Sequence, residues 1–259
     1  MGAEIRKKGG VKVTTIIETK DLVKNYGTKS VLQSINLSVQ AGEVVALLGP
    51  SGSGKSTLLR CLNGLESTTS GTILFNGQLV KQTEKSWQQL RPKIGMVFQS
   101  YDLFPNQTVL ENVTIGPVKV QKRAKKEVQL QAIEWLTRVG LKEQIDSYPR
   151  ELSGGQKQRV AIVRSLCMNP ELMLFDEVTA SLDPENVREV LEVILELAKT
   201  DKTLLIVTHE MEFARLVSDR IIFMADGQIV EEGATKQFFE APETERAYQF
   251  LRSLDFANL

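Results

Sequence analysis

The sequence predicts an α/β fold built on an open, mostly parallel sheet. Four short apolar runs, at residues 43–48, 96–98, 172–175 and 203–208, are typical of buried strands. The stretches between them include segments whose apolar residues recur with helical spacing. Ligand groups gather outside the carboxyl ends of the strands in such a sheet. We therefore expect the residues that follow the four runs to lie at one edge: Gly49, Gln99, Asp176 and His209.

The first of these strand ends carries a phosphate-binding loop. Residues 49–57 read Gly-Pro-Ser-Gly-Ser-Gly-Lys-Ser-Thr, which fits G-x-x-x-x-G-K-[ST] and predicts a P-loop NTPase core. The glycines let the backbone approach a phosphate, and a helix starting near Lys55 adds its positive dipole end. We expect ATP to contact Gly49, Ser51, Gly52, Ser53, Gly54, Lys55, Ser56 and Thr57. The alternative is a Gly/Ser-rich connection without a ligand.

Within this loop, Lys55 is expected to reach the β- and γ-phosphates, and the Ser56 hydroxyl is expected to bind Mg²⁺. Leu58, Leu59, Leu62 and Leu65 are predicted to form the apolar face of the following helix.

The apolar run at 172–175 ends in an acidic pair, Asp176 and Glu177. A carboxylate at the tip of a buried strand beside the phosphate loop is placed to hold Mg²⁺, directly or through water, and we assign this to Asp176. Glu177 is the candidate general base that activates water. A solvated acidic pair at a strand end is the alternative, and the phosphate loop argues against it.

A second helix start with the features of an anion site lies at residues 152–156, Leu-Ser-Gly-Gly-Gln. Ser153 and Gln156 have capping-box spacing, and Gly154 and Gly155 leave the first-turn N–H groups bare. A single nucleotide does not need two such sites. The alternative is an ordinary capped helix. Further on, Asp183 precedes a proline and is predicted to cap another helix.

Taken in order, the phosphate loop, Gln99, the pentapeptide, the acidic pair and His209 resemble the ATP-binding cassette (ABC) ATPases. The resemblance implies a RecA-like core with an N-terminal antiparallel β-subdomain and an inserted α-helical subdomain. It also implies a head-to-tail dimer in which Ser153, Gly154, Gly155, Gln156 and Asp183 contact the nucleotide of the other subunit. His209 would orient the attacking water, Gln99 would contact Mg²⁺ and water, and Tyr26 would stack on adenine. A core tyrosine is the alternative for Tyr26.

The chain is expected to divide into a loose leader at 1–13, a nucleotide-binding core with the β-subdomain at 14–99 and 166–232, a helical subdomain with the pentapeptide at 100–165, and a helical tail at 233–259. Hairpins are predicted around the turns at 76–77 and 226–227. No internal repeat appears, so one cassette per chain is expected.

Three groups of segments are most similar to the ATPase subunits of bacterial polar amino-acid importers: 97–112, 181–185, and the tail from 233 to 251. By that resemblance the partners are a second ATPase subunit, integral membrane permease subunits and, indirectly, a solute-binding protein. The location would be the cytoplasmic face of the inner membrane, with docking beside Tyr101, Leu103 and Phe104. The alternative for the last two is burial in their own domain.

The chain departs from the family pattern at Val178, where a proline is usual, and at Ala180 and Ser181, which invert the usual small pair. We expect the turn to survive these changes. Another transport class, such as an exporter or lipoprotein-release system, is an alternative, although Gly-Asn-Leu-Asp is usual there. A non-transport ABC ATPase is less compatible with a single cassette that lacks long insertions.

Composition excludes several other classes. The 259 residues carry 32 basic and 32 acidic side chains, so nothing favours nucleic acid as a partner. Cys61 and Cys167 have neither metal-binding nor redox spacing. The sequence contains no secretory signal and no apolar stretch long enough to span a bilayer.

Overall fold

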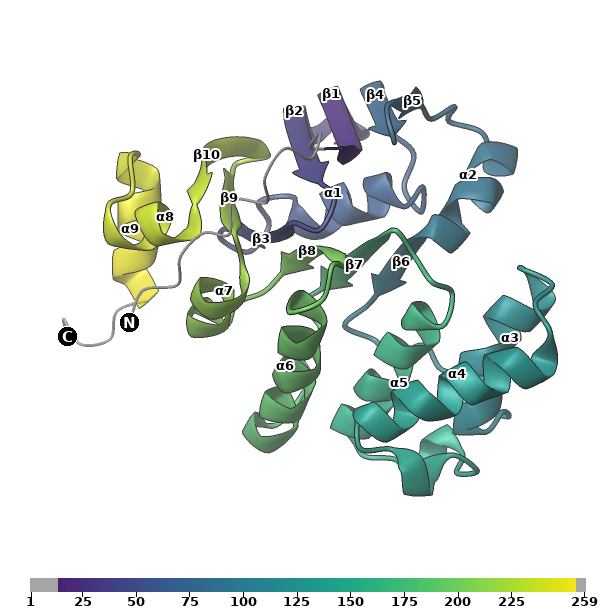
Figure 1. The fold of residues 1–259 in the computed structure, drawn as a ribbon. Coiled ribbons are helices and arrows are strands. Elements are labelled where there is room, and N and C mark those ends of the chain that lie inside the picture. Colours follow the sequence, from purple (N-terminus) through teal and green to yellow (C-terminus); the bar gives the residue numbers. More distant parts are fainter. Residues whose placement is uncertain (1–13, 255–259) are drawn as a thin grey trace.

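The computed structural model describes residues 14–254. The leader predicted at 1–13 and residues 255–259 of the tail lie outside the described residues. The described chain forms two sheets, with the helices distributed around and between them (Figure 1).

The core sheet has six strands in the order β10–β9–β3–β8–β7–β6. Neighbouring strands from β9 to β6 are parallel, and β10 is antiparallel to β9. All four predicted strands are present, and the predicted hairpin at 226–227 joins β9 and β10. The six strands of the core sheet are β3 (Val44–Leu48), β6 (Ile94–Val97), β7 (Leu172–Asp176), β8 (Thr203–Val207), β9 (Arg220–Ala225) and β10 (Gln228–Ala234). Every residue of β3, β7 and β8 is buried, as expected for parallel strands covered on both faces.

The second sheet is antiparallel, as the N-terminal sequence predicts, with the order β2–β1–β4–β5. Its strands are β1 (Thr15–Tyr26), β2 (Lys29–Gln40), β4 (Ser70–Phe75) and β5 (Gln78–Leu79). Helix α1 (Lys55–Leu62) lies between the two sheets, and one apolar cluster joins it to both (Figure 1). This position fixes the phosphate loop between them.

The predicted apolar face of α1 is wrong at its last member. Leu58, Leu59 and Leu62 are fully buried, but α1 ends at Leu62, and Leu65 is 48% exposed. The chain turns at Gly64, whose φ is 65°, and the ring of Trp87 occupies the space beside it. A Cβ at residue 64 would lie 2.0 Å from Trp87 Cδ2, so the helix cannot continue through this position with an ordinary side chain.

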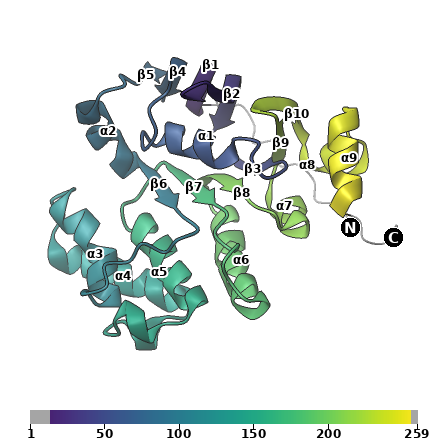
Figure 2. The ribbon, with the colours of Figure 1, turned by 180° about the vertical axis from the view of Figure 1, so that it is seen from behind.

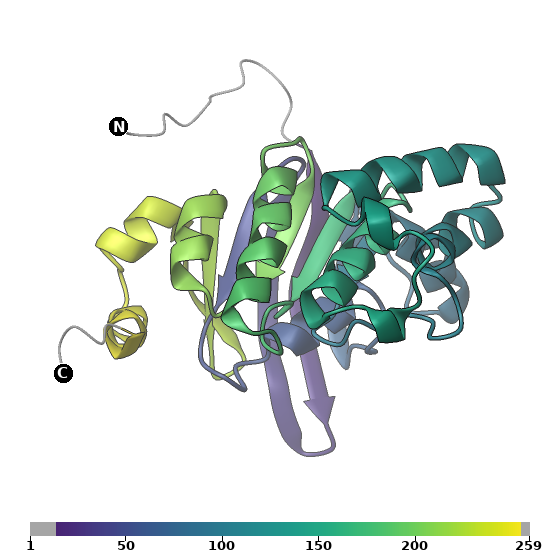
Figure 3. The same cartoon turned by 90° about the horizontal axis from the view of Figure 1, so that it is seen from below.

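Helices α3 (Val109–Lys119), α4 (Lys125–Arg138) and α5 (Gly154–Leu166) form a layer beside the β6 edge of the core sheet (Figure 2). Helices α6 (Pro184–Ala198) and α7 (Met211–Val217) cover the sheet face opposite to α1 (Figure 3). A groove of about 680 Å³ is lined by residues of α4, α5 and α6, and Trp135 and Val193 lie on its walls. The short segments η2 (Lys142–Gln144) and η3 (Pro149–Glu151) lie between α4 and α5 in the chain, whereas α2 (Glu84–Leu90) and η1 (Arg91–Lys93) lead from β5 into β6.

The tail forms two short helices, as the sequence predicts, at α8 (Thr235–Glu240) and α9 (Glu245–Leu254). Phe238 of α8 and Phe250 of α9 pack against Phe223 of β9. The buried carboxylate of Glu231 accepts the backbone N–H groups of Glu243 and Thr244, at 2.9 Å each, just before α9 begins. The tail is thereby attached to the last hairpin of the core.

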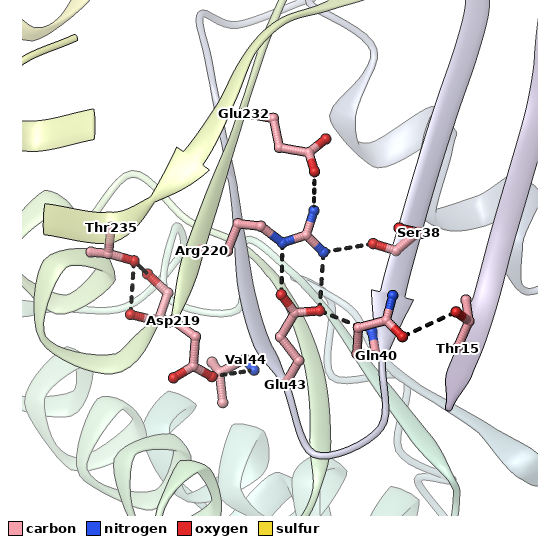
Figure 4. A network of polar contacts seen from close by, with 10 residues as sticks. Thr15, Ser38, Gln40, Glu43, Val44, Asp219, Arg220, Glu232 and Thr235 are labelled. Carbon is pink, nitrogen blue, oxygen red and sulfur yellow. Dashed lines mark hydrogen bonds and ion pairs between the residues drawn. The ribbon is translucent and has the colours of Figure 1, made fainter. Parts of the chain in front are cut away.

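A polar junction joins the amino end of the core sheet to the antiparallel sheet (Figure 4). The Arg220 guanidinium of β9 donates to both carboxylate oxygens of Glu43, at 2.6 and 3.0 Å, and to the Ser38 carbonyl of β2 at 2.6 Å. It also pairs with Glu232 of β10. One side chain therefore connects three strands and the start of β3, at the sheet end opposite to the phosphate loop.

Candidate functional site

The phosphate loop follows β3 and leads directly into α1. Gly49 and Gly54 have φ values of 148° and 100°. A Cβ at Gly49 would lie 2.0 Å from the Met224 carbonyl oxygen, and one at Gly54 would lie 2.8 Å from Leu32 and from the Val31 carbonyl oxygen. Both positions therefore need glycine on conformational and steric grounds.

Two buried side chains of this loop are suited to a phosphate. Lys55 Nζ donates to the carbonyl oxygens of Gly49 and Pro50, both at 2.9 Å. Burial lowers the pKa of the Lys55 ammonium, and the nearby charges of Glu177 and Asp176 oppose that shift. The Ser53 hydroxyl is buried without a hydrogen-bond partner among the described residues. A phosphate oxygen would satisfy both groups, so the loop fits a nucleoside phosphate.

The loop opens into a cavity of about 700 Å³. Besides the phosphate loop, its walls come from Glu177, from β1 and β2, and from the β9–β10 turn. The lining residues are Tyr26, Lys29, Ser30, Val31, Gln33, Ser51, Gly52, Gly54, Lys55, Ser56, Thr57, Glu177, Asp226 and Gly227. The wall formed by β2 and the turn at 226–227 is not predictable from the sequence, because the Asp-Gly turn pattern does not indicate which strand the turn will approach.

Tyr26 lies at the far wall of this cavity and is 47% exposed. It is therefore not the core tyrosine that the alternative interpretation requires. The buried Lys24 places Nζ 4.6 Å from the centre of the Tyr26 ring and forms an ion pair with Glu66 at 3.1 Å. The cation holds the aromatic ring in place beside the cavity.

A second cavity, of about 610 Å³, brings together the predicted metal-binding residues Ser56, Gln99 and Asp176. Ser56 Oγ donates to Asp176 Oδ1 at 2.6 Å, and Arg60 lies 3.9 Å from Asp176 Oδ2. Burial raises the pKa of Asp176, while the Ser56 hydrogen bond and the charge of Arg60 act in the opposite direction. Hydroxyl, amide and carboxylate oxygens are ligands that suit Mg²⁺, so this donor set fits the ion.

Glu177 and His209 meet at the ends of two neighbouring strands. Glu177 Oε1 lies 2.9 Å from His209 Nε2. Glu177 has a φ of 48°, and its N–H donates to the Val207 carbonyl of β8 at 3.1 Å. This left-handed conformation turns the side chain of Glu177 away from that of Asp176, so the two carboxylates serve different cavities.

The departures at Val178, Ala180 and Ser181 are accommodated. Val178 is buried in the apolar cluster under the sheet, and a turn forms in which the Ala180 N–H donates to the Glu177 carbonyl at 3.1 Å. Ser181 Oγ lies 3.5 Å from the Gln99 carbonyl oxygen. The turn therefore survives without the usual proline.

The pentapeptide starts α5 as predicted. Ser153 is the N-cap, and its capping box with Gln156 is complete. Asp183 caps α6 in the same way and accepts the Asn186 N–H at 3.0 Å. None of the five residues Ser153, Gly154, Gly155, Gln156 and Asp183 is among the described residues that line either cavity. The fold thus brings these five candidate residues close to one another but leaves them outside the cavities beside the phosphate loop.

Three neighbours enclose the start of α5. A Cβ at Gly154 would lie 2.9 Å from the Tyr101 hydroxyl and 3.1 Å from Leu182, and one at Gly155 would lie 2.3 Å from Asn186 Oδ1. Because residues 154 and 155 are glycines, the side chains of Tyr101, Leu182 and Asn186 can pack against the backbone at the start of α5. Asn186 was not singled out from the sequence, since a residue in the first turn of a helix gives no sign of its tertiary neighbours.

Comparison with known proteins identifies the family. A model described as ABC transporter matches residues 32–180, and a model described as an AAA domain matches 146–215. The arginine transport ATP-binding protein ArtM of Bacillus subtilis is 51% identical over 239 residues, covering 92% of this chain and 100% of the relative. The chain belongs to the ABC transporter ATPase family.

Other relatives and solved structures agree. The glutamate transport ATP-binding protein GluA of Corynebacterium efficiens is 51% identical over 236 residues, covering 91% of this chain and 98% of the relative. A component of the ABC transporter complex cbiONQ from Clostridium perfringens matches with a TM-score of 0.79 and 32% identity, covering 95% of this chain and 97% of that one. A dimeric cassette bound to ADP and Pi in a post-hydrolysis state matches with a TM-score of 0.77 and 33% identity, covering 85% and 99%.

The cassette is therefore an ATPase with the P-loop fold that its sequence predicts. Among residues 14–254, no helix is both long enough and apolar enough to cross a membrane.

Proposed function

We propose that this cassette powers the import of polar amino acids by binding and hydrolysing ATP between two subunits. The similarity to ATP-binding proteins named for arginine and glutamate transport, over nearly the whole chain, supports the substrate class. The division into core, helical subdomain and tail that the sequence predicts is retained in this proposal. Integral permease subunits and, indirectly, a solute-binding protein would complete the importer at the cytoplasmic face of the inner membrane.

One observation carries the catalytic part of the proposal. Asp176, Glu177 and His209 at the ends of β7 and β8 lie near Ser56 in the first turn of α1, around the phosphate loop. Ser56, Asp176 and Gln99 would hold Mg²⁺, which neutralises the charge that develops on the phosphates. Glu177 would accept a proton from the attacking water, and His209, bonded to it, would orient the water and the γ-phosphate. Tyr26 would stack on adenine.

The assembly part rests on the two separate helix starts. The phosphate loop of one copy holds the nucleotide, and the start of α5 lies outside both cavities of its own chain. A head-to-tail dimer would place Ser153, Gly154, Gly155, Gln156 and Asp183 of one copy over the γ-phosphate held by the other. The dimeric structure with ADP and Pi supports this arrangement.

The experiment is a comparison of sedimentation with and without ATP for the Glu177→Gln variant, in which bound ATP persists. We expect a monomer without nucleotide and a dimer with ATP. Ser153→Arg on the same background should abolish the dimer by filling the anion site, while ATP affinity of the monomer remains nearly unchanged. An identical mass in both conditions for Glu177→Gln would rule out the shared-site arrangement.

The import part is tested separately. Vesicles that contain the permease partner should take up a polar amino acid only when this cassette and ATP are present inside. Stimulation of efflux instead would favour an exporter, and failure to copurify with any membrane permease would favour a non-transport ATPase.

A further inference from the structure

Asn186 connects the two segments that are proposed to contact the partner's nucleotide. Its Nδ2 donates to Asp183 Oδ2 at 2.7 Å, and its Oδ1 lies 3.3 Å from Ser153 Oγ. The bond between the Asn186 backbone N–H and Asp183 Oδ1, at 3.0 Å, is independent of the side chain. The amide therefore spans from the N-cap of α6 to the N-cap of α5.

The Asn186 side chain is held in place by packing as well. Its Oδ1, Cβ and Cγ lie so close to Gly155 that a Cβ there would be 2.3, 2.8 and 2.8 Å from them. The amide rests against the backbone of α5, in space that only a glycine leaves open. Its position is thus fixed on one side by α5 and on the other by the carboxylate of Asp183.

These contacts set the direction of each hydrogen bond. A carboxylate only accepts, so the NH₂ group of Asn186 must face Asp183, and its carbonyl oxygen must face Ser153. The Ser153 hydroxyl must then be the donor to Asn186. Ser153 Oγ also accepts the Gln156 N–H at 3.2 Å. The single hydroxyl hydrogen of Ser153 is therefore committed within its own chain.

We infer that Asn186 is a positioning residue that holds the Ser153 hydroxyl within its own subunit until the γ-phosphate of the partner's ATP replaces Oδ1 as the acceptor. This inference rests on the proposed contact between Ser153 and the partner's nucleotide. The hydroxyl has one hydrogen, so donation to a phosphate oxygen requires that its bond to Asn186 is given up. The Asp183 cap survives the exchange, because Nδ2 and the backbone N–H do not change partners.

The exchange has a measurable consequence. Dimerisation with ATP gives up one neutral hydrogen bond in each subunit, so removal of the Asn186 carbonyl should favour the dimer. Each neutral hydrogen bond corresponds to about a 2- to 12-fold change in an equilibrium constant, and a dimer gives up two, so the combined change is about 5- to 150-fold. A residue that merely stabilised α6 would have the opposite effect, since its loss would loosen the dimer contact.

The test uses the full chain with Glu177→Gln and measures the dissociation constant of the ATP-dependent dimer by sedimentation. Asn186→Ala, which acts in both subunits, should lower that constant by about 5- to 150-fold. If the alanine variant is poorly folded, Asn186→Leu is used in its place, because leucine fills the space beside Gly155 without a carbonyl. This variant should also lower the dissociation constant.

The matched control is the same pair of variants on a Ser153→Ala background. Without the hydroxyl there is no bond to exchange, so Asn186→Ala should leave the dissociation constant unchanged there. An unchanged or weaker dimer with both Asn186 variants, or equal tightening with and without Ser153, would overturn the inference. If Glu177→Gln itself forms no dimer with ATP, the proposed function fails first and the inference with it.

Discussion

His209 Nε2 and Glu177 Oε1 lie 2.9 Å apart, so the ends of β8 and β7 place the proposed base in direct contact with the residue proposed to orient the attacking water. The contact spans adjacent strands of a parallel sheet, where register is fixed by buried backbone pairing from Leu172 with Thr203 to Asp176 with Val207. Glu177 directly follows β7 and His209 lies two residues beyond β8, so this pairing fixes where the connections that carry the two side chains begin.

Glu177→Gln should lower steady-state ATP hydrolysis by about 10²- to 10⁴-fold, because an amide cannot accept the proton of water. ATP affinity should stay near wild type, since the phosphate loop is untouched. Phosphate release and equilibrium nucleotide binding measure the two quantities. Glu210→Gln, next to His209 but not among the residues that line the nucleotide cavity, is the matched control and should hydrolyse ATP normally. Near-normal hydrolysis by Glu177→Gln would refute its role as base.

Phe104→Glu should abolish uptake in vesicles with the permease, while ATP hydrolysis by the isolated cassette persists. Phe104 is 47% exposed in the segment after Gln99, whereas Leu103 packs against the apolar clusters of its own domain. Phe104 is therefore available to a permease, and Leu103 is the one of the two that belongs to the core. Leu130→Glu, at an apolar position on α4 that is 64% exposed, is the control and should transport normally. Full uptake by Phe104→Glu would show that the permease docks elsewhere.

Tyr101 is a poorer choice for that test than the sequence suggests. Its hydroxyl lies against the backbone of Gly154, so a charged residue at 101 would disturb the start of α5 as well as any docking surface.

Arg220→Met should lower the free energy of unfolding by about 3–5 kcal/mol, because it leaves the carboxylate of Glu43 without its partner. The side chains of Arg220 and Glu43 are only 17% and 15% exposed. Denaturant titration measures the change. Arg188→Met removes an ion pair whose arginine is 84% exposed, and it should change stability by less than about 0.5 kcal/mol. Equal changes in the free energy of unfolding for both variants would mean that burial of the Arg220–Glu43 pair does not determine how much it stabilises the fold.

Cys61 and Cys167 should react slowly with a maleimide in the native protein at neutral pH. Burial raises the pKa of the Cys61 thiol to about 11 and that of Cys167 to about 12. A raised pKa lowers the thiolate fraction at neutral pH, and the thiolate is the reactive form. Mass spectrometry should detect both adducts only after denaturant is added. Ser253→Cys adds an exposed thiol on α9 that should react at once, and rapid native labelling of Cys61 or Cys167 would contradict the burial.

The sequence predicts the central strands, the loop and the capped helices because each depends on local patterns. The apolar runs are short and bounded, and Ser153 and Asp183 are N-cap residues that can be recognised from their neighbours in the sequence. The prediction for Leu65 is wrong because the end of α1 depends on Trp87, a residue of α2 that packs there and is remote in the sequence. The wall at Asp226 and Gly227 and the contacts of Asn186 are likewise set by tertiary packing, which periodicity does not encode.

The two tryptophans of the chain lie in different layers, and this gives the cassette two natural optical probes. Trp87 is buried against Gly64 near the end of α1 and is not among the described residues that line the groove. Trp135 lines the groove between α4 and α6, with Arg138 5.0 Å from its ring, so its emission depends on the separation of these helices. With Trp87→Phe, the fluorescence of a single residue would report on the groove between α4 and α6, without any attached dye.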